Sequence, residues 1–560
     1  MQKRKLRILM CTEASFLSSG FSTYSKELLS RLYSTNKYKI AEFASYGLVN
    51  DPRDIHIPWR YYANAVKDND PRHGEYSSRT DNQFGRWRFD KVLLDFKPDV
   101  VIDIRDYWMS AYQALSPLRK LFHWILMPTV DSSPQQEDWI DTFISADAVF
   151  TYSDWGAEII RKQSGNTIKL IDSASPGVNL DIFKIHPDKE KVKQTLGLPQ
   201  NSIILGSVMR NQKRKLIPEL LYSFRKTLDT LEQQNPKLGE NLFLYLHTSY
   251  PDAGWDIPEL LRQERLSNKV FFTYYCPSCS YSQAHIFAHP LRPCPNCHET
   301  SFKLPSVTHG LSQEQLSNIY NCFDLYIQYS ICEGFGMPQV EAAACGVPII
   351  TVDYSAMVDV IEKLGAYAVK PAAKFKELET KAIRVYPDNN ELIRHILSFI
   401  SLPTPMQKQK GLQTRKLTEQ HYDWSNIIKK WEKHLDQLDE SGYRSDWNQP
   451  PTWMTPLSDT EMPKSKGDYF KYTANICAQN IKDVDAIGSM MILSMSKDAD
   501  YEFTQNGTNI QGFSYKEIIN NLSSYINNNN QAEKVRTSKV KFDDDFIQYA
   551  HLKDLDKEDT

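Results

Sequence analysis

Two glutamates flank a glycine-rich bend in the stretch CEGFGMPQVEAAACGVP, residues 332–348. Pro338 suits the first turn of a helix, because its ring fixes φ at a helical value and its missing N–H would be unpaired there. Gly334, Phe335 and Gly336 would then precede a helix N-terminus, where unpaired backbone N–H groups and the helix dipole favour an anion. Glycine also lets the backbone approach a ligand closely. The stretch therefore predicts an anion-binding turn between two carboxylates.

Glu333 and Glu341 are the carboxylates on either side of this turn. A carboxylate repels a phosphate at short range, so these side chains must bind a different part of the ligand. Sugar hydroxyls suit them, because hydroxyls can donate hydrogen bonds to a carboxylate. We expect Glu333 to face a hexose-like ring and Glu341, one helical turn further on, to face a ribose. The alternative is structural: Glu341 complements a helix dipole and Glu333 caps a turn.

Four cysteines form a second pattern, C-P-S-C and C-P-N-C with fourteen residues between them. Two tight turns that each present two thiolates are typical of a tetrahedral zinc site. The predicted ligands are Cys276, Cys279, Cys294 and Cys297. Four thiolates close the coordination shell and leave no position for water, so we expect a structural Zn²⁺, with the nearby His285, His289 and His298 as bystanders. The alternative is four free cysteines.

The string E-G-F-G-M-P-Q-V-E, followed by A-A-A-C-G-V-P-I-I-T, resembles the donor-site motif of the retaining GT-B glycosyltransferases of family 4, the glycosyl transferases group 1. Other segments resemble the same family: L-S-Q-E-Q-L-S-N-I-Y-N-C-F-D-L-Y-I-Q-Y-S, A-D-A-V-F-T-Y-S-D-W-G-A-E-I-I, P-G-V-N-L-D-I-F and Y-D-W-S-N-I-I-K-K-W-E. The resemblance covers about residues 5–438. It implies an α/β chain of the GT-B class, with two Rossmann-like doubly wound domains facing a cleft. It also implies transfer of a sugar from a nucleotide-diphosphate sugar to an acceptor hydroxyl.

The stretch S-V-M-R-N-Q-K-R-K-L resembles the family's Arg-x4-Lys pair, here Arg210 and Lys215. Breaking the bond between a sugar and a nucleoside diphosphate leaves negative charge on the β-phosphate. Family members commonly stabilise that charge without a metal, so cationic side chains and helix N-termini supply the compensation, and no catalytic metal is expected. We therefore expect Arg210 and Lys215 to face the turn at Gly334–Gly336. The alternative is two solvated residues in a basic loop.

Two segments depart from the family pattern. The loop S-S-G-F-S-T-Y resembles the family's glycine loop near the donor phosphates, but it holds one glycine, Gly20, where relatives often have two. Many relatives carry a histidine near the transferred sugar, whereas the corresponding stretch I-L-M-P-T-V-D-S-S-P offers Asp131. Asp131 either takes that catalytic place or caps the following helix. In the mechanism usually proposed for the family, the leaving phosphate itself assists the incoming hydroxyl.

Short β-branched runs alternate with helical patterns along most of the chain, which is typical of parallel sheets wound with helices. An amphipathic helix around Tyr422–Leu438 is predicted to place its apolar residues on one face. These residues are Trp424, Ile427, Trp431 and Leu435. The predicted strands are Arg7–Met10, Asp99–Ile104, Phe122–Met127, Asp147–Thr151, Ile203–Val208, Leu242–His247, Val270–Thr273, Leu325–Gln328 and Pro348–Val352.

We divide the chain into five parts. Residues 1–185 are predicted to form an N-terminal Rossmann-like acceptor domain and residues 186–415 a C-terminal Rossmann-like nucleotide-sugar domain. A zinc-ribbon insertion at 274–305 interrupts the second domain, and a crossover helix occupies 416–440. Residues 441–560 are predicted to be a linker and a partly disordered appendage, because they are rich in Pro, Asn and charged residues.

The composition bounds the setting. A formal net charge of −3 and 41% hydrophobic residues indicate folded domains and give no sign of a dedicated nucleic-acid or membrane binder. No apolar run approaches the ~20 residues that cross a bilayer, although peripheral membrane contact stays open. Nine cysteines without a disulfide framework suit a reducing compartment. We therefore expect a cytoplasmic protein, in the host cytoplasm if it is viral.

The sequence leaves the acceptor open among a glycan, a lipid-linked saccharide, a protein and a modified nucleobase. The P-T-V-D-S-S-P variant, the cysteine-rich insertion and the Asn-rich tail resemble virus-encoded members of the family, which adds the hydroxylated bases of phage DNA. The competing hypothesis is a catalytically vestigial GT-B scaffold that recruits partners through its zinc ribbon and tail. The presence of Arg210, Lys215, Glu333 and Glu341 speaks against that hypothesis.

Overall fold

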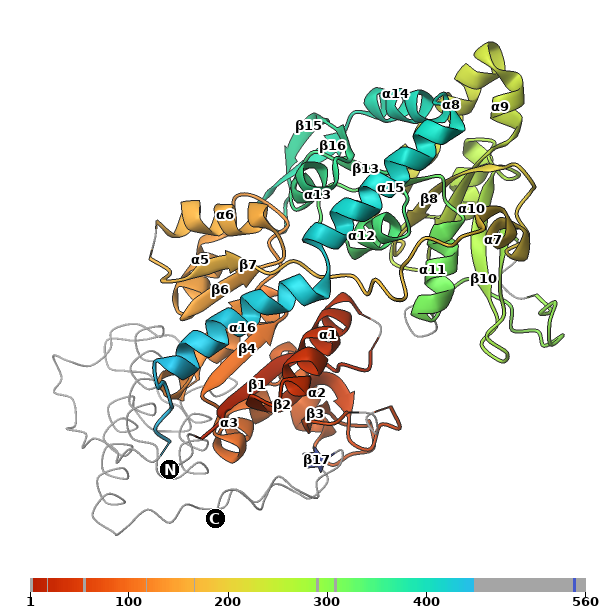
Figure 1. Cartoon of the computed structure of the whole chain (residues 1–560). Coiled ribbons are helices and arrows are strands. Elements are labelled where there is room, and N and C mark those ends of the chain that lie inside the picture. Colours follow the sequence, from red (N-terminus) through yellow and green to blue (C-terminus); the bar gives the residue numbers. More distant parts are fainter. Residues whose placement is uncertain are drawn as a thin grey trace, which may run out of the picture.

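The computed structural model describes residues 4–447, apart from 18, 54–56, 117, 166, 289–291 and 307–309, together with a strand at 547–549. These residues form two α/β domains, each built on a largely parallel sheet (Figure 1). The fold class expected from the alternation of apolar runs and helices is therefore confirmed. Most of the predicted appendage at 441–560 lies outside the described residues.

The N-terminal domain carries an eight-stranded sheet in the order β17-β3-β2-β1-β4-β5-β6-β7. Strands β1 to β7 run parallel, and β17 pairs antiparallel with β3 at the edge. Strands β1 and β4 are almost wholly buried, which is why they read as continuous apolar runs. The strands are β1 (Leu6–Glu13), β2 (Tyr38–Leu48), β3 (Arg60–Ala65), β4 (Val100–Ile104), β5 (His123–Met127), β6 (Ala148–Thr151), β7 (Ile171–Ser173) and β17 (Ile547–Tyr549).

Helices connect these strands and cover the sheet. They are α1 (Gly20–Ser34), α2 (His73–Ser77), α3 (Arg86–Phe96), α4 (Tyr107–Ser110), α5 (Glu137–Ile144) and α6 (Asp154–Ser164), with 3₁₀ turns at Thr80–Phe84, Ala111–Leu115 and Arg119–Leu121.

The C-terminal domain carries a seven-stranded sheet in the order β11-β10-β9-β8-β12-β13-β14, parallel except for β11. Strand β11 comes from the cysteine-rich segment and pairs with β10, so the predicted insertion extends the sheet. A separate hairpin, β15–β16, follows β14. The strands are β8 (Ile203–Val208), β9 (Leu242–His247), β10 (Val270–Tyr275), β11 (Ser282–Ile286), β12 (Leu325–Gln328), β13 (Ile349–Val352), β14 (Tyr367–Val369), β15 (Pro371–Lys376) and β16 (Ile383–Pro387).

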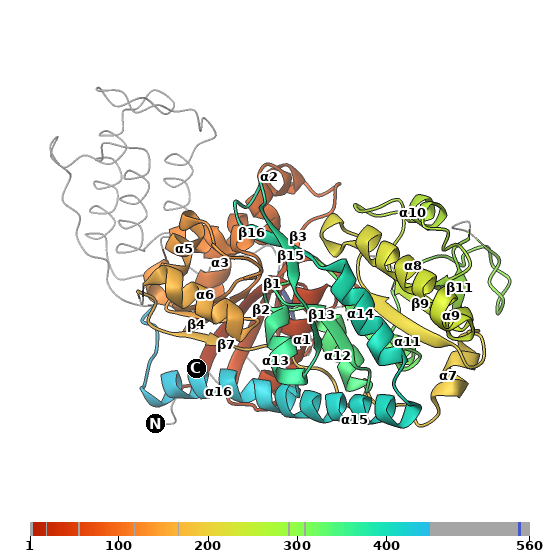
Figure 2. The same ribbon diagram turned by 90° about the horizontal axis from the view of Figure 1, so that it is seen from above.

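The helices of this domain lie on both faces of its sheet (Figure 2). They are α7 (Lys189–Thr195), α8 (Ile217–Gln234), α9 (Pro236–Glu240), α10 (Ile257–Gln263), α11 (Gln313–Asn321), α12 (Met337–Ala344), α13 (Met357–Leu364) and α14 (Asn389–Ile400), with a 3₁₀ turn at Lys213–Lys215. No helix in the described ranges is long and apolar enough to cross a membrane.

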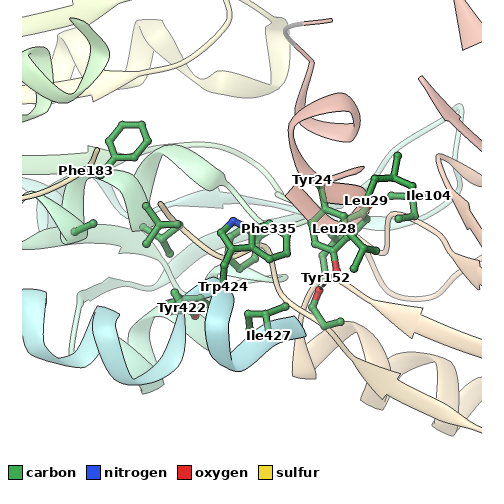
Figure 3. Close-up of a cluster of buried hydrophobic side chains, with 14 of the residues drawn as sticks. Tyr24, Leu28, Leu29, Ile104, Tyr152, Phe183, Phe335, Tyr422, Trp424 and Ile427 are labelled. Carbon is green, nitrogen blue, oxygen red and sulfur yellow. Dashed lines mark hydrogen bonds between the residues drawn. The ribbon is translucent and has the colours of Figure 1, made fainter. Parts of the chain in front are cut away.

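Two consecutive helices, α15 (Thr404–His421) and α16 (Trp424–Glu440), run from the second domain back to the first (Figure 1). The predicted apolar face of α16 is confirmed, since its buried residues are Trp424, Ile427, Trp431 and Leu435. Trp431 stacks on Phe150 with ring centroids 4.5 Å apart and donates its indole N–H to the Tyr24 hydroxyl at 2.8 Å. Figure 3 shows Trp424 and Ile427 between residues of the two domains. The crossover helix therefore ties the domains into one core.

The domains also contact each other directly. Asp359 on α13 accepts hydrogen bonds from the backbone N–H groups of Asp154 and Trp155 at 2.7 and 3.0 Å. These two N–H groups lie in the first turn of α6 and have no partner within their helix, so a carboxylate from the other domain satisfies them. Lys363 pairs with Asp154 at 2.7 Å on the same side.

Candidate functional site

Glu333 lies at the centre of the candidate site, in the loop between β12 and α12, with its side chain 4% exposed. Its carboxylate accepts hydrogen bonds from Lys215, from Arg214 Nη1 at 2.9 Å, from Gln328 Nε2 at 2.7 Å and from Ser330 Oγ at 3.0 Å. The carboxylate is thus held by two cations and two neutral donors. A buried carboxylate with this many partners is fixed in orientation.

The charges around Glu333 set its protonation state. Burial by itself would raise the pKa of Glu333, but the charges of Lys215 and Arg214 outweigh burial and hold the pKa at about 2. Burial lowers the pKa of Lys215, and the Glu333 carboxylate opposes that effect. At neutral pH Glu333 is therefore an ionised hydrogen-bond acceptor.

The two residues of the predicted pair, Arg210 and Lys215, bind different carboxylates in the structure. Arg210 forms a two-bond ion pair with Asp252, 2.9 Å on both sides, and its side chain is 45% exposed. Arg214 reaches Glu333 in its place, and its backbone C=O also accepts from the Ile331 N–H at 3.0 Å. Sequence reasoning missed Arg214. The signal was the run Lys213–Lys215, in which only the geometry of the 3₁₀ turn selects the residues that point inward.

The glycine turn occupies the predicted place before a helix. Gly336 has φ of +85° and precedes α12, whose first turn holds a proline as expected. A Cβ at Gly334 would collide with Thr129 of the N-terminal domain, so this glycine permits close approach of the two domains. The Phe335 side chain is buried and packs edge-on against Tyr422, with centroids 5.6 Å apart (Figure 3). The Phe335 ring therefore anchors the turn against the junction of α15 and α16.

Glu341 lies on α12 and accepts a hydrogen bond from the Tyr320 hydroxyl of α11 at 2.6 Å. Burial raises the pKa of Glu341 to about 7. It differs from Glu333 in having no cation among its hydrogen-bond partners in the described structure. The two glutamates of the motif are therefore in opposite electrostatic environments.

Asp131 lies on the N-terminal side of the cleft, in the loop after β5. The residue at the N-cap of α5 is Gln136, so Asp131 does not cap that helix. Instead its carboxylate pairs with Arg384 of β16 at 2.9 Å and accepts a hydrogen bond from the Cys332 thiol at 3.4 Å. Since Cys332 precedes Glu333, the structure brings Asp131 close to the glycine turn of the other domain.

Gly20 is the first residue of α1, and a Cβ there would meet no atom within 4 Å. The N-terminus of α1 is capped by Ser19, whose hydroxyl also donates to Glu13 at the end of β1. A second carboxylate, Asp106, follows β4, and burial together with the charges of Asp131 and Glu13 raises its pKa. Sequence reasoning missed Glu13 and Asp106, although both lie where ligands bind in such sheets, at the carboxyl ends of strands.

The four cysteines meet as predicted, with their sulfur atoms within 4.8 Å of one another. Cys276 and Cys297 lie 3.6 Å apart, and Cys279 and Cys294 lie 3.7 Å apart. A tetrahedral zinc site with Zn–S bonds of about 2.3 Å places its sulfurs about 3.8 Å apart, whereas a disulfide needs about 2.05 Å. The residues therefore fit a zinc ion.

The two cysteine turns share one backbone shape. Ser280 and His298 each follow the first cysteine of their turn by four residues, adopt φ near +60° and donate their N–H to that cysteine's C=O at 2.8 and 2.9 Å. His285 bonds a backbone C=O, and His289 lies outside the described residues. Phe302 packs beside Tyr274 and Tyr281 under the turns. The cluster is thus part of the hydrophobic core at the edge of the sheet.

Comparison with known proteins agrees with this arrangement. Residues 306–396, which hold both glutamates and the glycine turn, match the family model described as Glycosyl transferases group 1. Sucrose-phosphate synthase from Thermosynechococcus elongatus has a similar structure, with a TM-score of 0.55 at 17% identity over 78% of this chain and 100% of that one. The chain has the GT-B fold. HepE from Anabaena is a second similar structure, solved in complex with UDP and glucose, with a TM-score of 0.53, 15% identity and coverage of 77% and 100%.

One curated protein is also similar to this GT-B chain. D-inositol 3-phosphate glycosyltransferase from Streptomyces bingchenggensis (strain BCW-1) is 23% identical over 209 residues. The match covers 37% of this chain and 38% of that protein, so it spans less than half of either.

Proposed function

We propose that this protein is a retaining glycosyltransferase that moves a sugar from a nucleotide-diphosphate sugar to an acceptor hydroxyl. The observation that carries the proposal is the ionised Glu333, held by Lys215 and Arg214 at the start of the glycine turn that contacts the other domain of a GT-B fold. The match of residues 306–396 to a glycosyl transferase family model and the UDP-glucose bound in the similar HepE structure support it.

Each group around the turn has a role in this proposal. Glu333 accepts hydrogen bonds from hydroxyls of the transferred sugar, because it is ionised and its orientation is fixed. Lys215 and Arg214, with the N–H groups at the start of α12, balance the charge that develops on the leaving diphosphate. Arg210 lies at the edge of this site, where its ion pair with Asp252 can exchange for a phosphate. Glu341 accepts from the ribose hydroxyls in place of Tyr320.

Asp131 is the acidic group of the N-terminal domain that bonds to Cys332, the residue before Glu333. It fills the place where relatives carry a histidine, and its pairing with Arg384 and Cys332 keeps it beside the turn. Gly20, which leaves space free of protein atoms at the start of α1, allows the donor phosphates or the acceptor to approach that helix end. The sugar therefore lies between Asp131 and Glu333.

The cysteine cluster would hold a structural Zn²⁺ through Cys276, Cys279, Cys294 and Cys297. Such a metal supplies folding energy and does not touch the substrate. All eight cysteines among the described residues are free thiols, which supports a reducing compartment such as the cytoplasm. The acceptor is a hydroxyl of a glycan, a lipid-linked saccharide, a protein or a modified nucleobase such as a hydroxylated base of phage DNA.

The test is a panel of UDP-, GDP-, ADP- and dTDP-sugars. We expect one nucleotide sugar to raise the melting temperature and to be slowly hydrolysed without an acceptor, with NMR showing an α-anomer released from an α-linked donor. Glu333→Gln should keep the fold and lose the hydrolysis. A folded protein that neither binds nor hydrolyses any donor would instead be the vestigial scaffold, and retained hydrolysis in Glu333→Gln would remove the role of Glu333.

A further inference from the structure

The hairpin β15–β16 of the C-terminal domain reaches the loop after β5 in the N-terminal domain. Ile383 donates its N–H to the Ser133 C=O at 3.2 Å, forming an isolated bridge between the two domains. The Tyr354 hydroxyl donates to the Ile383 C=O and fixes the same end of the strand. Figure 2 shows the hairpin on the side of its domain that faces the first domain. The hairpin therefore forms a strap between the two domains.

Arg384, the residue after Ile383 on β16, is the charged residue of the strap that contacts the N-terminal domain. Its side chain is 6% exposed. It donates to the Asp131 carboxylate at 2.9 Å, to the Asp131 backbone C=O at 3.2 Å, and to Glu377 at 2.8 and 3.0 Å. A guanidinium stays charged at any pH that the fold survives and presents its donors in a rigid fork. It therefore holds both the side chain and the backbone of Asp131.

The two oxygens of Asp131 have different partners. Oδ1 meets Arg384, while Oδ2 accepts the thiol of Cys332 at 3.4 Å. A thiol is a weak donor, so a substrate hydroxyl can replace the Cys332 thiol as the hydrogen-bond donor to Oδ2. Rotation of the Asp131 carboxylate would break the bond between Oδ1 and Arg384 and would move Oδ2 away from this position. Arg384 thus presents one oxygen of Asp131 toward the glycine turn.

We propose that Arg384 is a positioning residue that fixes the Asp131 carboxylate opposite Glu333 when the two domains are closed. This inference rests on the proposed sugar transfer. Arg384 is not itself proposed to touch the sugar, because four of its five N–H donors bond to Asp131 and Glu377. Its role is to keep one carboxylate oxygen at a defined place on the acceptor side, where a misplacement of about 1 Å costs about 10²-fold in rate.

The experiment uses the full-length protein, the nucleotide sugar that raises its melting temperature most, and release of nucleoside diphosphate as the readout. We expect Arg384→Gln to lower kcat about 10²-fold while the donor KM changes little. Arg384→Lys, which keeps the charge but not the fork, should recover part of kcat. Arg394→Gln is the matched control, since Arg394 is 69% exposed and pairs with Glu391 of its own helix. If Arg384→Gln does not fold, the kcat of Arg384→Lys tests the inference: a value below that of the wild type supports it, and a wild-type value overturns it.

A reversed pair separates positioning from tethering. Asp131→Arg combined with Arg384→Asp can restore an ion pair between the domains but removes the carboxylate from the N-terminal side. We expect the melting temperature to recover toward the wild-type value while kcat stays low. Recovery of kcat in the reversed pair, or wild-type kcat in Arg384→Gln, would overturn the inference alone. Failure of the wild-type protein to turn over any donor would overturn the proposed function, and the inference with it.

Discussion

Lys215→Met tests the charge arrangement around Glu333 most directly. The Lys215 and Glu333 side chains are 9% and 4% exposed, so solvent screens their attraction little. The fall in the pKa of Glu333 from 4.5 to about 2 corresponds to about 3 kcal/mol, at ~1.4 kcal/mol per unit. Because Arg214 supplies part of this stabilisation, we expect Lys215→Met to lower the free energy of unfolding at pH 7 by about 2 kcal/mol.

The pH dependence gives the sign of the effect. The pKa of Glu333 is depressed in the folded protein, so the stabilisation is present above about pH 4.5 and is lost as the pH falls toward about 2. The difference between wild type and Lys215→Met should therefore be large at pH 7 and shrink below pH 4. Chemical denaturation followed by tryptophan fluorescence at several pH values measures it. Donor turnover should fall about 10²-fold, because Lys215 is a cation proposed to balance the charge of the leaving diphosphate.

Lys213→Met is the matched control for this prediction. Lys213 lies in the same 3₁₀ turn but is exposed, so its loss should change the free energy of unfolding by less than about 0.5 kcal/mol and leave turnover intact. If Lys215→Met and Lys213→Met were equally stable, or if Lys215→Met kept wild-type turnover, the reasoning about a buried, functional ion pair would be refuted.

Three further predictions concern the cysteine cluster, Glu341 and the pair of His123 and His434. Cys276→Ser should abolish the zinc content measured by elemental analysis and lower the melting temperature, because the cluster belongs to the core of the second domain. A zinc-free variant that melts at the wild-type temperature would contradict this. Glu341→Gln should weaken nucleotide binding in a titration yet stabilise the unliganded protein above pH 7. Burial raises the pKa of Glu341 to about 7, so its ionisation costs stability as the pH rises from 4.5 through 7; equal melting of variant and wild type at pH 9 would argue against it. Stability should fall as the pH drops from about 6.5 toward 4. Burial lowers the pKa of His123 to about 4, although the negative charge of Asp147 opposes this effect. Burial also lowers the pKa of His434, whose Nε2 lies 3.2 Å from that of His123. Both side chains therefore take up protons when the protein unfolds between these pH values. Melting curves of His434→Gln should show a smaller loss over this range, and an unchanged loss would exclude the pair as its cause.

Buried strands were the part of the fold that the sequence predicted best. The predicted strands Ile203–Val208, Leu242–His247 and Leu325–Gln328 have the observed bounds of β8, β9 and β12. Such strands are covered on both faces, so their local sequence alone shows a continuous apolar run. Helices α12 and α16 were likewise predicted from local sequence, α12 from its flanking glycines and prolines and α16 from the spacing of its apolar residues.

Elements without an apolar signal were missed. Helix α15 buries Gly411, Thr414 and Thr418, and a Cβ at Gly411 would collide with the backbone of Gly346. This helix packs by close approach of small residues, so it has no apolar stripe to find. Strand β15 is largely exposed and β16 has only five residues, so the hairpin gave no apolar pattern either, although it bridges the two domains.

The sequence by itself determined the chemistry that short spacing encodes: two glutamates around a glycine turn, four cysteines in two tight turns, and basic residues after a buried strand. Each of these groups is assembled within a few residues, or from two such turns, so local backbone geometry suffices. Only the tertiary structure decided that Arg214 rather than Arg210 meets Glu333, and that Arg384, 253 residues away in sequence, holds Asp131. The first contact joins the loops after β8 and β12 within the second domain, and the second depends on how the two domains dock through α16, so no local sequence pattern records either of them.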